Sequence, residues 1–130
     1  MRIKEVMKSV QVINGESSIR DAASLMSKQK IGSLIVLNGK SLSGIITERD
    51  ILTRVTANNK LPEKVMIKNV MTPKMITIDS EALIDDAVYL MLKHKIKRLP
   101  VTSEKKLVGM ITSTDIMANS DELGQFYFFE

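Results

Sequence analysis

The chain of 130 residues contains no cysteine and no tryptophan, and its single histidine is His94. The lack of cysteine excludes disulfide bonds, a zinc finger and a cysteine nucleophile. One histidine excludes a metal site built from several histidines of one chain. No apolar run approaches the roughly 18 residues of a membrane-spanning helix, and the N-terminus has no signal-peptide pattern. We therefore expect a cytoplasmic protein with no membrane partner, and these absences favour binding over catalysis.

Aromatic residues are also scarce, and four of the five lie together at Phe126–Phe129. The net charge is +4 and the pI is near 9.4, which is compatible with nucleic acid or phosphate ligands. The positive charge is spread along the chain except at 93–98, and no basic stretch is interleaved with aromatic rings. Nucleic acid is therefore an improbable partner.

An internal duplication is the strongest feature that is present. Residues 16–51 and 81–116 are identical at 18 of 36 aligned positions, at an offset of 65. Such self-similarity indicates two copies of one supersecondary unit. We divide the chain into a first repeat at 1–58, a connector at 59–69, a second repeat at 70–118 and an aromatic tail at 119–130. The two repeats are expected to form one folding unit, because a repeat of this size can hardly bury its sheet alone.

Each repeat has the pattern of a strand, a helix, two strands and a second helix, which predicts an α+β fold. Apolar residues recur at helical spacing in both first helices; these are Ile19, Ala22, Ala23 and Met26, and Ile84, Ala87, Val88 and Met91. Asp79 or Ser80 is the expected N-cap of the second of these helices. Asn38-Gly39 predicts a tight hairpin in the first repeat, and Ser103-Glu104-Lys105 replaces it in the second.

Two Gly-x-x-Thr-x-x-Asp segments, 44–50 and 109–115, follow buried strands. A threonine at the N-cap with an acidic residue three positions later is a capping arrangement. The same geometry could present free amides to a phosphate, and the carboxylate could accept hydrogen bonds from a ribose diol. Gly44 and Gly109 would allow a neighbouring strand to approach closely.

These motifs together resemble a tandem pair of CBS (cystathionine β-synthase) domains, also called a Bateman module. The resemblance covers roughly residues 3–118; it includes Val6-Met7, Val70-Met71-Thr72-Pro73, Leu25-Met26, Leu90-Met91, Lys97-Arg98-Leu99-Pro100-Val101 and both Gly-x-x-Thr-x-x-Asp segments. It implies two repeats packed sheet to sheet about a pseudo-two-fold axis. It also implies adenosyl ligands, commonly AMP, ADP or ATP, in two clefts between the repeats.

The resemblance assigns the ligand-binding residues of each cleft. The first would contain Thr47, Arg49, Asp50, Lys74, Met75, Lys97 and Arg98. The second would contain Thr112, Asp115, Ser9, Val10, Gly32 and Ser33. Because two cations in the first cleft correspond to Gly32 and Ser33 in the second, we expect the first to bind a nucleotide more tightly.

The sequence therefore predicts a stand-alone regulatory module that binds an adenine nucleotide, forms a homodimer, acts on an unknown protein partner and catalyses no reaction. It requires no metal or other cofactor. A nucleic-acid-associated regulator, an enzyme and a dimerisation module with empty clefts stay open as alternatives. The residues of Phe126–Phe129 are expected to pack on the chain's own core or on a dimer mate.

Overall fold

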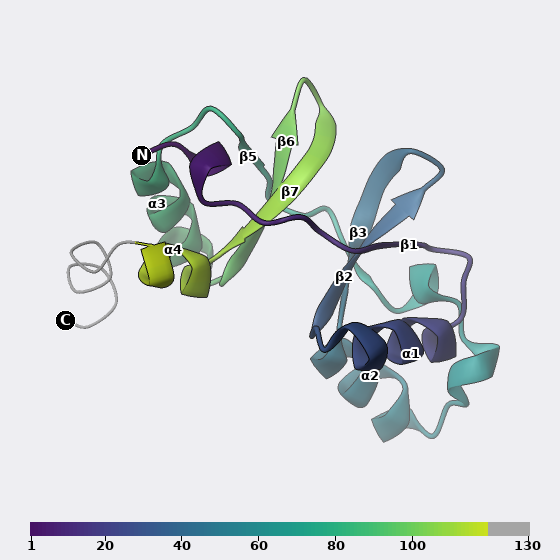
Figure 1. Cartoon of the computed structure of the whole chain (residues 1–130). Helices are drawn as coiled ribbons and strands as arrows, with labels where there is room; N and C mark the ends of the chain where they lie inside the picture. The colour runs from purple at the N-terminus through teal and green to yellow at the C-terminus, as the bar shows by residue number, and fades with distance from the viewer. Residues whose placement is uncertain (120–130) are drawn as a thin grey trace. The chain divides into compact units, whose positions relative to one another are not determined.

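The structure, a computed structural model, describes residues 1–119, so the predicted aromatic tail lies outside this range except for its first residue, Asn119, which ends the last helix. The chain divides into two compact units. The central unit is Gln11–Met75, and the composite unit combines Met1–Val10 with the chain from Ile76 onward (Figure 1). Each unit therefore contains most of one sequence repeat and the opening segment of the other.

The central unit is a four-stranded sheet packed against two helices. Its elements are β1 (Val12–Asn14), α1 (Ile19–Gln29), β2 (Ser33–Asn38), β3 (Ser41–Thr47), α2 (Glu48–Arg54) and β4 (Thr72–Pro73). Short 3-10 turns lie at Thr56–Asn58, Pro62–Lys64 and Ile67–Asn69. The strand order is β1-β2-β3-β4, with β1 parallel to β2 and the other pairs antiparallel.

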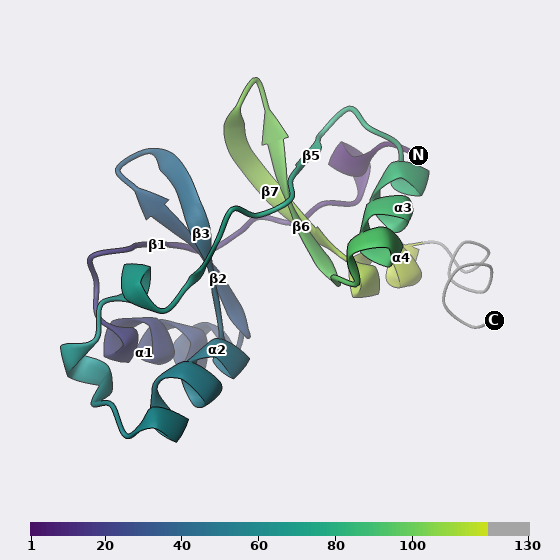
Figure 2. The ribbon, with the colours of Figure 1, turned by 180° about the vertical axis from the view of Figure 1, so that it is seen from behind.

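The composite unit repeats this arrangement, and Figure 2 shows both units from behind. Its elements are a 3-10 turn (Ile3–Glu5), β5 (Ile78–Asp79), α3 (Ile84–His94), β6 (Arg98–Ser103), β7 (Lys106–Thr112) and α4 (Ser113–Asn119). The strand order is β5-β6-β7, with β5 parallel to β6 and β6 antiparallel to β7. The predicted α+β class and the β-α-β-β-α order of each repeat are confirmed.

The buried faces of α1 and α3 follow the predicted spacing with one exception. Ile84, Ala87, Val88 and Met91 of α3 are all buried. In α1 the buried residues are Ile19, Ala22 and Met26, whereas Ala23 is exposed, so its predicted burial is wrong. The buried stripe of α1 is narrower because residues at i, i+3 and i+7 suffice to cover its sheet.

The prediction that Asp79 or Ser80 caps α3 is wrong. Leu83 is the N-cap, and its amide donates to Asp86 Oδ2 at 3.0 Å. Asp79 instead accepts a hydrogen bond from the Glu81 amide at 2.8 Å, and the Ser80 amide donates to Thr102 O at 2.9 Å. Both residues therefore form the turn that leaves β5, which places the start of the helix further along the chain.

The two hairpins turn at different residues from those predicted. Asn38 still pairs with Ser41, so the turn is Gly39-Lys40, and Gly39 has a φ of 64°. Ser103 pairs with Lys106, so the second turn is Glu104-Lys105, with φ values of 51° and 68°. A two-residue loop in which both residues are left-handed is a type I′ turn, and this turn favours the sequence Asn-Gly. The second hairpin therefore has backbone strain that the first avoids.

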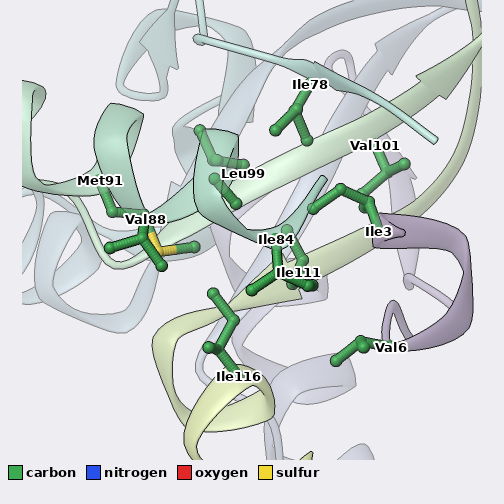
Figure 3. Packing of buried hydrophobic residues seen from close by; sticks show 11 residues of the cluster. Ile3, Val6, Ile78, Ile84, Val88, Met91, Leu99, Val101, Ile111 and Ile116 are labelled. Atoms are coloured by element: carbon green, nitrogen blue, oxygen red, sulfur yellow. The ribbon is translucent and has the colours of Figure 1, made fainter. Parts of the chain in front are cut away.

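Each unit buries an isoleucine from a segment outside the repeat that supplies its helices. Ile3 and Val6 lie in the apolar cluster of the composite unit, with residues of α3, α4, β5, β6 and β7. Figure 3 shows both side chains, from the N-terminal segment, pointing into this cluster. Ile67 and Val70 have the equivalent role in the central unit. The Ile3 and Ile67 side chains are fully buried.

We predict that Ile3→Ala selectively weakens the composite unit. Truncating a fully buried isoleucine costs roughly 2–5 kcal/mol. Amide exchange measured by mass spectrometry should accelerate in α3 more than in α1, and the matched variant Ile67→Ala should show the opposite preference. If Ile3→Ala accelerated amide exchange equally in α1 and α3, the assignment of Ile3 to the composite unit would be contradicted.

We also predict that Glu104→Asn combined with Lys105→Gly stabilises the chain. Relieving two left-handed residues should gain about 1–2 kcal/mol in chemical denaturation. Lys40→Gly is the matched control, since Lys40 does not have a positive φ. That control should give no gain, and equal stabilisation by both changes would refute the strain argument.

Candidate functional site

The segment from Thr47 to Asp50 joins β3 to α2 through a reciprocal cap. Thr47 Oγ1 accepts from the Asp50 amide at 3.1 Å, and Asp50 Oδ2 accepts from the Thr47 amide at 3.0 Å. This is a capping box, and the Asp50 side chain is only 13% exposed. The carboxylate is thus held in a fixed orientation at the end of the strand.

The same arrangement recurs between β7 and α4. Thr112 Oγ1 accepts from the Asp115 amide at 3.1 Å, and Asp115 Oδ2 accepts from the Thr112 amide at 3.0 Å. Both segments therefore have the predicted capping geometry. The duplication extends from the sequence to the hydrogen bonds.

The caps leave fewer free amides than the sequence suggested. The amides of Asp50 and Asp115 donate to the capping threonines. Those of Glu48 and Ser113 donate to Gly32 O at 3.0 Å and to Lys97 O at 2.9 Å. The expectation that these helix N-termini present their first amides to a phosphate is wrong for these four groups.

In each unit a segment of the opposite sequence repeat pairs with the strand that leads into the cap. In the central unit β4 pairs with β3, with Pro73 opposite Gly44 and Thr72 opposite Ile45. Lys74 and Met75 follow directly after β4. The exchange of segments therefore brings these two residues into the same unit as Thr47 and Asp50.

The composite unit has the matching arrangement. Lys8 and Met110 exchange two backbone hydrogen bonds of 2.9 Å, and Ser9 and Val10 follow Lys8. In both units, therefore, the exchanged segment pairs with the strand that leads into the Thr-Asp cap.

Gly44 and Gly109 make these close approaches possible. A Cβ atom on Gly44 would lie 2.5 Å from Thr72 O, and one on Gly109 would lie 2.8 Å from Lys8 O. Both distances are shorter than van der Waals contact. The predicted role of the two glycines in the approach of a neighbouring strand is confirmed.

The structure divides the predicted binding residues between the units. The central unit holds Thr47, Arg49, Asp50, Lys74, Met75, Gly32 and Ser33. The composite unit holds Thr112, Asp115, Ser9, Val10, Lys97 and Arg98. Within the composite unit, Arg98 pairs directly with Thr112 across the sheet, as Ser33 pairs with Thr47 in the central unit. The pairing of Lys97 and Arg98 with Thr47, and of Gly32 and Ser33 with Thr112, stays a prediction.

Arg54 is a residue of this region that the sequence did not single out. Its Nη1 donates to Val70 O at 2.8 Å and to Thr72 Oγ1 at 3.2 Å, and its Nη2 lies 3.5 Å from Asp50 Oδ1. The spacing of Asp50 and Arg54 by four residues is a detectable signal of an ion pair on a helix. The contacts with residues 70–72 have no sequence signal.

Residues 1–119 contain no group of three or more His, Asp or Glu side chains that could hold a metal ion. Across the same residues no helix is long and apolar enough to cross a membrane.

This fold and its paired Thr-Asp segments define a tandem CBS module. A family model described as the CBS domain matches residues 3–57 and 67–122. The chain belongs to this family, and the resemblance seen in the sequence is confirmed.

Similar proteins extend over most of the chain. It is 33% identical over 118 residues to the uncharacterized protein YlbB of Bacillus subtilis, covering 88% of this chain and 79% of that protein. It is 30% identical over 118 residues to the CBS domain-containing protein YhcV of the same organism, covering 90% and 84%. The structure of a hexameric CBS-CP12 protein from bloom-forming cyanobacteria matches with a TM-score of 0.84 and 29% identity, covering 96% and 71%.

We predict that Gly44→Ala separates β4 from β3. The added methyl would collide with backbone, so the strand must shift, at a cost of roughly 1–3 kcal/mol. Amide exchange should increase at residues 71–75, and the melting temperature should fall. Ser43→Ala, the neighbouring change, should leave this exchange unaltered. Unchanged exchange in Gly44→Ala would contradict the close approach.

Proposed function

We propose that this chain is a stand-alone regulatory module that binds an adenine nucleotide, AMP, ADP, ATP or a related adenosyl ligand. One observation carries the proposal: in each unit a capped Thr-Asp pair lies beside an inserted strand that only a glycine permits. The carboxylate would accept hydrogen bonds from the ribose diol. Lys74-Met75 and Ser9-Val10, the residues that follow the inserted segments, would line the base.

Cations would replace the helix amides as phosphate contacts. Arg98, which offers a planar fork of donors, lies opposite Thr112, and Lys97 precedes it. Our prediction from the sequence gives these two cations to the ligand held by Thr47 and Asp50. We keep the expectation that the Asp50 site has the higher affinity.

The proposed module catalyses no reaction. A nucleophile requires an adjacent base or a lowered pKa, and each Thr-Asp pair here is engaged in mutual capping with backbone amides. His94 is exposed at the end of α3, and it is not adjacent in sequence to either Thr-Asp pair. The carboxylates are therefore assigned to ligand recognition.

Signalling would arise from differential binding. A ligand that binds two states with different affinity shifts their populations, whereas one with equal affinity shifts nothing. We propose that the shifted equilibrium is the association of the chain as a homodimer or its contact with a protein partner. The existence of a hexameric CBS-CP12 protein shows that a similar chain assembles into oligomers.

Isothermal titration with AMP, ADP, ATP, S-adenosylmethionine and NAD tests the proposal. We expect at least one of them to bind, Asp50→Ala to remove the tighter event and Asp115→Ala to remove a weaker one. Loss of one acceptor for a ribose diol should weaken its site by roughly tenfold or more. Glu63→Ala, an exposed acidic control, should bind as the wild type does.

Two results would contradict this account. If none of the five ligands bound or raised the melting temperature, the chain would be a structural dimerisation module. If Asp50→Ala left the tighter affinity unchanged while Asp115→Ala abolished it, the order of the two sites would be reversed.

A further inference from the structure

We propose that Arg54 is a positioning residue that makes the Asp50 site tighter than the Asp115 site. Arg54 joins the two walls of the Asp50 site, the carboxylate and the strand that leads to Lys74 and Met75. The inference rests on the proposed function, because it concerns the same site. It adds a cause for unequal affinity that lies entirely within the central unit.

The guanidinium of Arg54 links two chain segments, α2 and residues 70–72. One nitrogen, Nη1, donates to Val70 O and Thr72 Oγ1, and the other, Nη2, faces Asp50 Oδ1. The donors of arginine are fixed in one plane, so their directions are set together. The orientation of the carboxylate and the position of residues 70–72 are therefore coupled through one rigid group.

Arg54 orients Asp50 without blocking it. The Thr47 amide occupies one acceptor position on Oδ2, and Arg54 lies near Oδ1. Each carboxylate oxygen can accept about two hydrogen bonds. One position on each oxygen is thus left for the two hydroxyls of a ribose. A carboxylate already held in place loses less conformational freedom when a ligand binds.

Among residues 1–119, the composite unit has no equivalent of this link. Asn119 occupies the position of Arg54, and its Nδ2 donates to the backbone oxygen of Asp115 at 2.7 Å. Lys8 occupies the position of Thr72. Among the described residues no hydrogen bond or ion pair is recorded for Asp115 Oδ1. The two sites share a cap and differ in what orients the carboxylate.

Ligand titration in an Asp115→Ala background tests the proposal, since only the Asp50 site then reports. The probe is whichever of the five ligands above the wild type binds most tightly. Arg54→Met should weaken this ligand roughly tenfold. Arg54→Lys keeps the charge but loses the planar fork, and it should remain at least about threefold weaker. Arg20→Met, an exposed change on α1, should have no effect.

A second readout separates positioning from general stability. Amide exchange at residues 70–75 should increase in Arg54→Met without ligand, while exchange in β1 and β2 stays the same. The reverse experiment introduces the link into the composite unit. Asn119→Arg combined with Lys8→Thr, in an Asp50→Ala background, should raise the ligand affinity of the Asp115 site. A gain there cannot come from lost stability.

The proposal is overturned if Arg54→Met binds within twofold of its parent, or if Arg54→Lys restores the full affinity. If the wild type binds none of the five ligands, the proposed function fails first. Unchanged exchange at residues 70–75 in Arg54→Met would then refute the link itself, independently of any ligand.

Discussion

The contact of a strand with a bare glycine is the constraint on which the rest of this structure depends. Gly44 lies under the backbone of Thr72, and Gly109 lies under that of Lys8, where no side chain would fit. Because Thr72 belongs to the second repeat and Lys8 to the first, the contact binds each unit to a segment of the other repeat. The buried isoleucines Ile3 and Ile67 secure the same exchange in the apolar cores.

The exchange of segments also explains how two short repeats produce two similar sites. A Thr-Asp pair alone is a helix cap, and many helices begin in this way. In the proposed function, the same pair would form one side of a binding site, and the inserted segment from the other repeat would form the opposite side. The sites then diverge through single residues, with Arg54 facing one carboxylate and Asn119 occupying the equivalent position at the other. Two sites of unequal affinity would respond to different ligand concentrations.

The sequence predicted the features that periodicity and duplication encode. The two β-α-β-β-α repeats, the buried face of α3 and the capping role of Thr47 and Thr112 all follow from local patterns. The cap of α3 was predicted at the wrong residue because Asp79 and Ser80 serve the preceding turn equally well. The contact of Arg54 with Val70 O joins segments 16 residues apart through a backbone atom, so no side-chain pattern reveals it.

The central claim is that the Thr-Asp segment and the inserted strand are two walls of one nucleotide site. Nuclear magnetic resonance titration of the isotope-labelled chain with AMP measures both walls at once, through the amides of Asp50 and Lys74. The account predicts that both signals shift along the same binding curve, and that Asp50→Ala abolishes the two shifts together. Binding that moves only one of the two amides, or neither, would contradict it.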